Sequence, residues 1–135
     1  LFRSKCKIID VYDGDTCTVA IILNGSKTGF KVRMFGYDSP EMKPPRDAPN
    51  RNNIKVAAMQ AKTMLRQKTK GFCYIDCNDW DKYGRLLGTI YCLEKSKTCC
   101  FSKNKWVNVN EWMVKKGYGR KYYGGKKNQI METNK

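Results

Sequence analysis

The sequence predicts an α+β fold that is mainly β, a barrel of five strands with two or three flanking α-helices. Three observations lead to this prediction. Five short runs rich in β-branched and apolar residues are separated by turn signals along the 135 residues. One stretch between the third and fourth runs has the three-to-four-residue period of an amphipathic helix. A further helix signal follows the fifth run.

The first three expected strands are residues 7–11, 16–23 and 30–37. An Asp-Gly-Asp turn separates the first strand from the second, because glycine and aspartate favour tight turns. Asn24-Gly25-Ser26 is a hairpin signal between the second strand and the third. Three consecutive short strands form a meander.

A loop and then a helix are expected next. Residues 43–53 hold three of the four prolines and few apolar side chains, which predicts a mobile surface loop without helix. From Ile54 to Leu65, apolar residues recur every three or four positions, with lysines and arginines on the other faces. This period predicts an amphipathic helix from residue 54 that ends near Gly71.

The last two strands are expected at residues 73–78 and 85–92, joined by a turn that holds Asp81 to Arg85. Residues 93–105 form a polar connection without an assigned structure. The spacing of Asn108 and Glu111 is typical of a capping box, in which the asparagine oxygen accepts from the amide three residues later. It predicts a short helix that stops at Gly117.

Five strands, interrupted by one helix and followed by another, suit a small Greek-key barrel of the oligonucleotide-binding (OB) type. Such barrels bind oligonucleotides across one strand face and its flanking loops. The length supports one domain. We therefore expect a single domain over residues 1–135, with a core of about 7–125 and a polar tail over 126–135.

Charge indicates the kind of partner. The 27 basic and 12 acidic residues give a net charge of +15, and a surplus of this size usually accompanies a polyanion. Nucleic acid is the leading candidate. An anionic membrane is disfavoured, because the basic residues are dispersed and no apolar run approaches the length of a membrane span.

The seven cysteines and the absence of histidine bear on metal and redox chemistry. No Cys-x-x-Cys pair occurs, so a structural zinc site is not expected. Four cysteines are interpreted as small core residues: Cys17, Cys73, Cys77 and Cys92. Cys99 and Cys100 lie in the polar connection. The sequence leaves open whether either of them forms a disulfide, with Cys6 as one candidate partner. Cysteine usage favours a reducing compartment weakly, and because the chain begins at Leu1 both secreted and intracellular locations stay open.

Four clusters of charge carry the chemistry: residues 13–16 (Asp-Gly-Asp-Thr), Arg33, residues 38–41 (Asp-Ser-Pro-Glu) and residues 81–85 (Asp-Lys-Tyr-Gly-Arg). Carboxylates can hold a hard cation and activate a water molecule. Fixed arginines can hold a phosphate and neutralise the charge that develops on it. Asp-Gly is a common turn and Asp-Ser-Pro is a common way to leave a strand, so each is a weak signal alone. Asp15 opens the second expected strand, Arg33 lies within the third, residues 38–41 follow it and Arg85 opens the fifth, an order that a small barrel can bring together. The combination predicts a nuclease.

These stretches, together with Val-Asn-Glu at 109–111 followed by Gly117 and tyrosines, resemble the staphylococcal nuclease (thermonuclease) family. The resemblance covers about residues 8–125. It implies a Ca²⁺ site with Asp15, Asp38 and the main-chain carbonyl of Ser39 as ligands. It also implies that Glu41 orients or deprotonates the attacking water.

The resemblance implies the substrate contacts as well. Arg33 and Arg85 would hold the scissile phosphate, and Lys82 and Tyr83 would contact a terminal phosphate. Tyr122 or Tyr123 would contact a base. The family hydrolyses DNA and RNA to products with 3′-phosphate ends and prefers single-stranded or frayed substrate, and we expect a monomer.

Two alternatives are weighed against hydrolysis. One is a catalytically silent nucleic-acid-binding barrel of the same fold. A silent relative would be free to lose a member of the catalytic set, whereas this chain keeps Asp15, Arg33, Asp38, Glu41 and Arg85. The other, a protein-binding module with an aromatic cage, finds no support in the tyrosine spacing. The chain departs from the bacterial enzyme in its longer, basic connection at 93–105, which either extends the nucleic-acid surface or forms a solvated loop.

Overall fold

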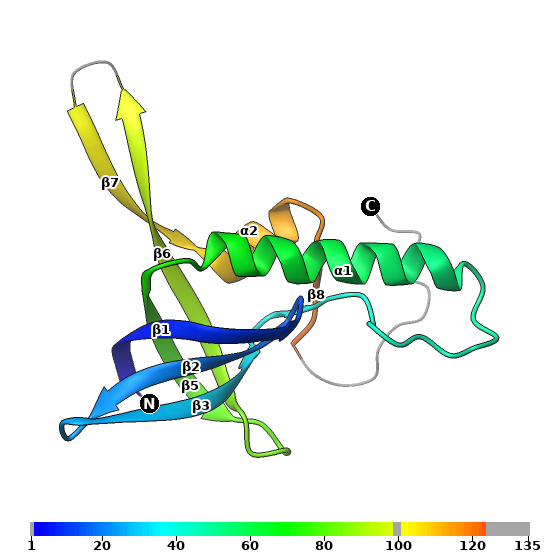
Figure 1. Ribbon diagram of the computed structural model, residues 1–135, viewed down its shortest axis with the longest axis horizontal. Coiled ribbons are helices and arrows are strands. Elements are labelled where there is room, and N and C mark those ends of the chain that lie inside the picture. Colours follow the sequence, from blue (N-terminus) through cyan, green and yellow to red (C-terminus); the bar gives the residue numbers. More distant parts are fainter. Residues whose placement is uncertain (1, 99–100, 124–135) are drawn as a thin grey trace.

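The structure, a computed structural model, describes residues 2–98 and 101–123 (Figure 1). Its elements in chain order are β1 (Phe2–Asp13), β2 (Thr16–Leu23), β3 (Ser26–Met34), β4 (Tyr37–Asp38), α1 (Arg51–Lys68), β5 (Phe72–Trp80), β6 (Leu86–Thr98), β7 (Phe101–Asn108), α2 (Val109–Lys115) and β8 (Arg120–Lys121).

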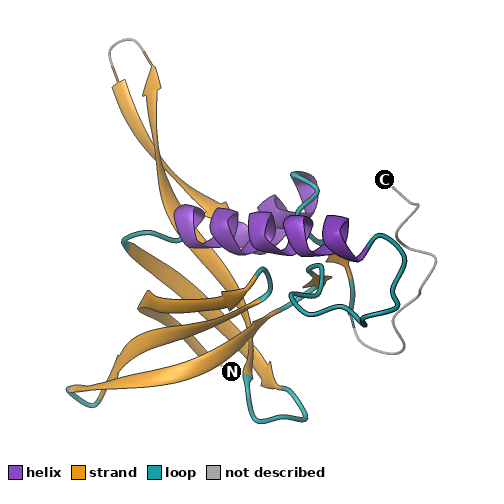
Figure 2. Ribbon diagram, turned by 45° about the vertical axis from the view of Figure 1, so that its right-hand side comes forward, coloured by secondary structure: helices purple, strands orange, loops and turns teal. Residues whose placement is uncertain are grey.

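The described strands form the predicted barrel. They follow the order β3-β2-β1-β5-β6-β7, and neighbouring strands are antiparallel. A parallel pairing of β3 with β6 closes the barrel over β1, β2, β3, β5 and β6. Figure 2 shows the two described helices together on one side of the strands. The OB-type fold expected from the sequence is therefore confirmed.

The core fills the barrel and the space beneath the helices. Val19, Val32 and Ile75 are buried inside the barrel, and Leu65 of α1 and Met113 of α2 belong to the same cluster. Burial of this apolar surface is the main force that holds helices and strands together.

The cysteines are part of this core, as expected for Cys17, Cys73, Cys77 and Cys92. Cys6 is buried as well and is a free cysteine opposite Cys73 across the β1–β5 pair. The disulfide of Cys6 that the sequence left open is therefore not formed in this structure. Cys99 and Cys100 themselves lie outside the described residues.

Turn and cap predictions hold where a local signal was strong. Asn24 and Gly25 have φ of 50° and 80°, as a tight two-residue hairpin requires. The Asn108 side chain accepts a hydrogen bond from the Glu111 amide at 3.1 Å, which caps α2. Gly117 has a φ of 82° just beyond the helix.

Several boundaries differ from the prediction, and the third expected strand, 30–37, is divided between β3, which ends at Met34, and β4. α1 begins at Arg51, so residues 51–53 are helix and not loop, and it ends at Lys68. Its N-cap, Asn50, is left-handed with a φ of 59° and makes no side-chain capping bond, unlike a usual N-cap asparagine. The first and third strands also begin earlier than expected, at Phe2 and Ser26. Their added ends are mostly exposed, so they lack the hydrophobic alternation that predicts a strand, although Cys6 is buried in the core.

The polar connection expected at residues 93–105 is an antiparallel ribbon. β6 continues to Thr98 and pairs with β7 from Phe101, with Glu94 opposite Lys105. In Figures 1 and 2 this ribbon extends away from the barrel, past the helices. The tail expected at 126–135 lies outside the described residues. Within the described residues no helix is both long and apolar enough to cross a membrane.

Candidate active site

One open groove of about 960 Å³ contains every site residue that the sequence predicted. It lies where the β1–β2 turn, the end of β3, the segment after β4, the β5–β6 turn and the chain after β8 meet. The predicted residues that line it are Asp15, Arg33, Asp38, Ser39, Glu41, Lys82, Tyr83, Arg85, Tyr122 and Tyr123.

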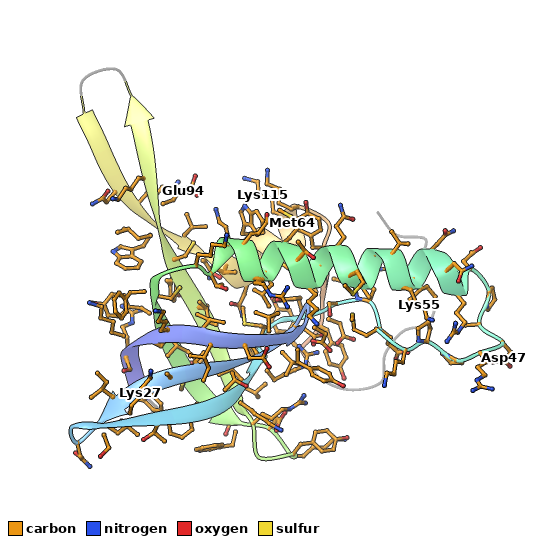
Figure 3. All side chains as sticks on the ribbon, in the orientation of Figure 1. Lys27, Asp47, Lys55, Met64, Glu94 and Lys115 are labelled. Carbon is orange, nitrogen blue, oxygen red and sulfur yellow. The ribbon has the colours of Figure 1, made fainter. Side chains whose placement is uncertain are left out.

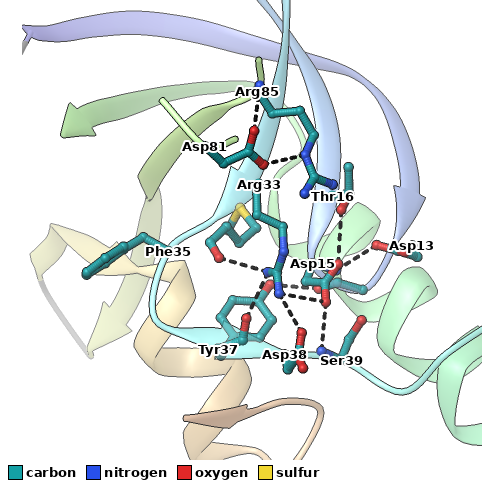
Figure 4. A network of polar contacts seen from close by, with 12 residues as sticks. Asp13, Asp15, Thr16, Arg33, Phe35, Tyr37, Asp38, Ser39, Asp81 and Arg85 are labelled. Carbon is teal, nitrogen blue, oxygen red and sulfur yellow. Dashed lines mark hydrogen bonds and ion pairs between the residues drawn. The ribbon is translucent and has the colours of Figure 1, made fainter. Parts of the chain in front are cut away.

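Asp15 is the most enclosed of the carboxylates in the groove. Its Oδ1 accepts from the Thr16 hydroxyl at 3.0 Å, and its Oδ2 accepts from the main-chain amide of Ser39 at 2.9 Å (Figure 4). Burial alone would raise the pKa of Asp15, but hydrogen bonding with Asp13 and the charge of Arg33 outweigh burial and lower it. Asp15 is thus an ionised carboxylate fixed in place by donors on both oxygens.

Asp13 also lines the groove, although the sequence predicted only that it lies in a turn and assigned it no individual role. Its carboxylate accepts from the main-chain amide of Asp15 at 3.1 Å. Burial, together with the neighbouring carboxylate of Asp15, raises the pKa of Asp13 to about 6. Two aspartates separated by one residue in a tight turn are the sequence signal for such a pair.

Arg33 is held by main-chain and side-chain acceptors at once. One terminal nitrogen donates to the carbonyls of Tyr37 at 2.8 Å and Met34 at 3.0 Å. The other donates to Asp38 at 2.5 Å and lies 3.5 Å from Asp15. Both carboxylates implied as metal ligands therefore lie beside one guanidinium, although they come from different segments, the β1–β2 turn and β4.

The β1–β2 turn is fixed against the loop that carries Ser39. The Tyr37 hydroxyl donates to the carbonyl of Gly14 at 2.7 Å, and the Met34 amide donates to the carbonyl of Asp15 at 2.8 Å. Gly14 is in close contact with its surroundings, because an added Cβ would lie 2.6 Å from the Cβ of Ala61 and 2.7 Å from that of Ser39. The turn, the loop and helix α1 thus support one another.

The second arginine is placed by Asp81, another residue to which the sequence assigned no role. Asp81 accepts from the side chain of Arg85 at 2.6 Å, from the main-chain amide of Arg85 at 2.8 Å and from that of Tyr83 at 2.9 Å. The Arg85 guanidinium also lies 5.4 Å from the centre of the Tyr83 ring. One carboxylate therefore folds the turn and orients the arginine at its end.

The remaining predicted residues lie on the rim of the groove. Glu41, Lys82 and Tyr83 are exposed. The β4–β8 pair brings the C-terminal tyrosines here, and Tyr123 packs edge-on against Phe35 with ring centres 5.6 Å apart. Both Tyr122 and Tyr123 line the groove, so the choice between them stays open.

Asn110 is a buried residue whose role the sequence did not suggest. Its side chain accepts from the Ile90 amide at 3.0 Å and donates to the carbonyls of Phe35 at 2.8 Å and Gly88 at 3.0 Å. It joins α2 to β6 and to the corner after β3, next to the groove. An asparagine in the first turn of a helix gives no local signal for contacts of this kind.

The donor set of the groove suits a hard cation. No cluster of three or more His, Cys, Asp or Glu side chains is found among the described residues. Asp15 and Asp38 offer two carboxylates, and the Ser39 main chain is held against Asp15. The Ser39 hydroxyl is buried without a hydrogen-bond partner in the described structure. Two carboxylates and main-chain oxygen, completed by water, fit a partly hydrated Ca²⁺ ion.

A closed OB-type barrel with carboxylates and arginines facing one groove defines a nuclease-like barrel domain. The chain belongs to the staphylococcal nuclease family, since the family model described as staphylococcal nuclease homologue matches residues 31–135. The resemblance inferred from the sequence motifs is thereby confirmed. The β1–β2 turn with Asp13 and Asp15 precedes the matched residues, and the barrel brings it to the groove.

Two curated relatives are similar over most of this chain. An uncharacterised protein of Bacillus anthracis is 30% identical over 115 residues, which is 85% of this chain and 46% of the relative. An uncharacterised protein of Methanocaldococcus jannaschii is 29% identical over 138 residues, covering 86% of this chain and 58% of the relative. The chain spans about half the length of the curated relatives it matches.

Proposed function

We propose that this protein is a Ca²⁺-dependent, sugar-nonspecific endonuclease that hydrolyses phosphodiester bonds of DNA and RNA and leaves 3′-phosphate ends. One observation carries the proposal: Asp15, Asp38, Glu41, Arg33 and Arg85 face the same groove. Such a set combines metal ligands, a group that can activate water and two phosphate-binding forks. Membership of the staphylococcal nuclease family supports the same reaction class.

Asp15, Asp38 and the main-chain carbonyl of Ser39 would hold the ion. When bound, Ca²⁺ polarises the phosphate and offsets the negative charge that develops on it. Asp15 is suited to this role because it is ionised and held by hydrogen bonds.

The protein's own side chains would carry out the rest. Glu41 orients the water and accepts its proton, from an exposed position at the rim where water has access. Arg33 and Arg85 bind the phosphate oxygens. Each is already oriented, Arg33 by two main-chain carbonyls and Arg85 by Asp81, so little rotational freedom is lost when the phosphate arrives.

The open groove and its aromatic rim favour a single strand or a frayed end over an intact duplex. Lys82 and Tyr83 would contact a terminal phosphate, and Tyr122 or Tyr123 would stack on a base. Stacking does not depend on base identity, which is consistent with a nuclease of low specificity.

The test is cleavage of single-stranded DNA, duplex DNA and RNA with Ca²⁺, with Mg²⁺ and with chelator, followed by analysis of the product ends. We expect Ca²⁺-dependent cleavage and 3′-phosphate ends. Metal-independent cleavage or none would overturn the proposal. Binding of nucleic acid without cleavage would identify a silent member of the fold.

The roles are tested with Glu41→Gln and Arg85→Lys. We expect Glu41→Gln to lower kcat by about 10²–10⁴-fold, because a positioned base contributes that much. Arg85→Lys keeps the charge but loses the two-pronged contact, so it should also impair cleavage. Asp47→Asn is a matched control, because Asp47 lies at the far end of the loop before α1 (Figure 3). Full activity of Glu41→Gln would refute the assignment of the base.

A further inference from the structure

Strand β6 links the groove to a second surface of the barrel. Leu86, Ile90 and Cys92 point into the core, so the alternate side chains lie on the outer face of the sheet. Arg85 and Leu87 line the active-site groove. The side chains that follow on the same face are Thr89, which is buried, then Tyr91 and Leu93, and they continue from the groove along one strand. At about 3.3 Å per residue, the series from 85 to 93 spans roughly 26 Å.

A second cavity makes this path continuous. It has a volume of about 410 Å³ and is lined by Thr89 and Tyr91 of β6. It shares Phe35, Gly36 and Tyr123 with the active-site groove. Tyr91 therefore lines a cavity that adjoins the active-site groove at Tyr123.

Beyond Tyr91, the outer face of the sheet carries exposed aromatic side chains. Tyr74 of β5 is the cross-strand partner of Tyr91, and Trp106 of β7 is the partner of Leu93. The Tyr74 and Trp106 rings contact each other edge-on, with centres 4.9 Å apart. Trp106 is 47% exposed and Phe72 is 63% exposed. Contiguous exposed apolar surface of this kind marks a binding site.

Basic side chains from β1 border these rings. Lys5 pairs with Tyr74 and its ammonium lies 4.6 Å from the centre of the Phe72 ring. Arg3 lies 5.6 Å from the centre of the Tyr91 ring and forms an ion pair with Asp76. Arg3 and Asp76 thereby neutralise each other, and Lys5 adds a positive charge beside the rings.

Aromatic rings interleaved with cations form the kind of surface that binds single-stranded nucleic acid, with bases on the rings and phosphates on the cations. The positive charge disfavours a second copy of this chain as the occupant. Continuity with a groove of the same chemistry favours nucleic acid further.

We propose that the outer face of β1, β5, β6 and β7, defined by Lys5, Phe72, Tyr74, Tyr91 and Trp106, is a second binding surface for single-stranded nucleic acid. It continues the active-site groove along β6 and holds the part of the strand that extends beyond the scissile phosphate. This inference rests on the proposed function in one respect: the nucleic-acid strand is taken to extend from a scissile phosphate in the groove onto this surface.

The test compares oligonucleotides of two lengths, about 4 and about 16 nucleotides, the range that single OB barrels cover. Affinity for fluorescein-labelled single-stranded DNA is measured by fluorescence anisotropy in chelator, so that no cleavage occurs. Trp106→Ala should weaken binding of the long oligonucleotide by about fivefold or more, as expected for one lost stacking contact. Binding of the short one, which the groove alone can accommodate, should change by less than about twofold.

Conservative variants separate stacking from simple loss of structure. Trp106→Phe keeps an aromatic face and should retain most of the affinity, whereas Trp106→Leu should not. Met59→Ala is the matched apolar control, because Met59 is 50% exposed on α1. Lys5→Ala should lower the magnitude of the slope of log affinity against log salt by about 1, the loss expected for one phosphate contact. Lys27→Ala, at the β2–β3 hairpin (Figure 3), is the control and should leave that slope unchanged.

Equal affinity of Trp106→Ala and the parent protein for the long oligonucleotide would overturn the proposal, and so would equal behaviour of the Phe and Leu variants. The result is independent of catalysis. Length-dependent binding in a protein that cuts nothing would leave this surface standing and remove the proposed function. Metal-dependent cleavage by a protein whose Trp106→Ala variant binds the long oligonucleotide as tightly as the parent would support the proposed function and remove this surface.

Discussion

At the level of single residues, Gly14 lets the β1–β2 turn pack closely against its neighbours because it has no side chain. Its Cα lies between the Ser39 loop and Ala61 of α1, and its carbonyl accepts from Tyr37. Because Asp15 follows directly, the position of that carboxylate depends on how closely the turn approaches the helix.

We expect Gly14→Ala to lower the free energy of unfolding by about 1–3 kcal/mol, because its Cβ would overlap Ala61 and Ser39. Cleavage should fall as well, since the turn can relieve the overlap only by moving Asp15. Denaturant unfolding and cleavage rates measure the two effects. Gly29→Ala is the control, because the nearest atoms to its Cβ would be 4.0 Å away. Unchanged stability of Gly14→Ala would show that the turn is not held as tightly as the structure indicates.

Asp81 makes the orientation of Arg85 depend on pH. Burial acts to raise the pKa of Asp81, but hydrogen bonds from the Arg85 amide and side chain outweigh it and lower the pKa below the ordinary 3.8. A carboxyl group with a lowered folded-state pKa stabilises the fold above its unfolded-state pKa. That contribution is lost as pH falls through the folded-state pKa.

Asp81→Asn should therefore be less stable than the parent protein at pH 7, by about 1–3 kcal/mol for the lost charged hydrogen bonds. The difference should begin to shrink as the pH falls below about 4, where the unfolded parent binds a proton, and should disappear as the pH passes the lower folded-state pKa. Thermal unfolding over a series of pH values measures this. Asp79→Asn, in the same segment, serves as the control, and a difference that is independent of pH would contradict the assignment.

Among the elements, the outer part of the β6–β7 ribbon follows Cys92 in β6 and precedes Val107 in β7. It is attached to the barrel but contributes little to the free energy of unfolding. Its described side chains from Leu93 to Lys95 and from Asn104 to Trp106 are exposed. A ribbon that buries little apolar surface adds little to stability. The sequence did not reveal it for the same reason, since a strand exposed on both faces has no hydrophobic period.

We expect that replacing residues 96–103 with an Asn-Gly turn between Lys95 and Asn104, which are cross-strand partners, changes the free energy of unfolding by less than about 1 kcal/mol. Chemical denaturation compares this variant with the parent protein. Ile90→Ala, in the buried part of the same strand, should cost about 2–5 kcal/mol. A loss from shortening as large as that of Ile90→Ala would mean that the ribbon belongs to the cooperative core.

At the scale of the whole molecule, five cysteines are built into one core. Burial raises the pKa of the Cys6 and Cys73 thiols to about 12 and that of Cys77 to about 11, and it raises those of Cys17 and Cys92 as well. The thiolate is the reactive form, so these groups are chemically inert while the barrel is intact.

We expect none of these five cysteines to react with iodoacetamide in the native protein at about pH 8, and all of them to react after unfolding in denaturant. Mass spectrometry of peptides locates the modified residues. The sign of the pH effect is fixed, because a raised pKa keeps the thiol protonated up to higher pH. Modification of Cys6 or Cys73 in the native state at the rate of an exposed thiol would show that the core opens locally.

The sequence predicted those parts of the molecule that depend on local chemistry. Cys73 and Cys77 alternate as a half-buried strand requires, Asn24-Gly25 forms the expected turn, and all predicted site residues meet in the groove. Contacts between distant segments left no local signal. The three hydrogen bonds of Asn110 and the close approach of Gly14 to Ala61 depend on how the elements pack, which no spacing encodes.

Strand β6 has a consequence for how the chain tolerates insertions and deletions. Its inward side chains fill the core, and its outward side chains line the groove and the aromatic surface. Adding or removing one residue between Arg85 and Cys92 would exchange the two faces for everything beyond the change. The described side chains just beyond Cys92, from Leu93 to Lys95, are exposed, and changes there cost far less. Length variation among functional versions of this domain should therefore concentrate in the ribbon, with the first seven residues of β6 fixed in number.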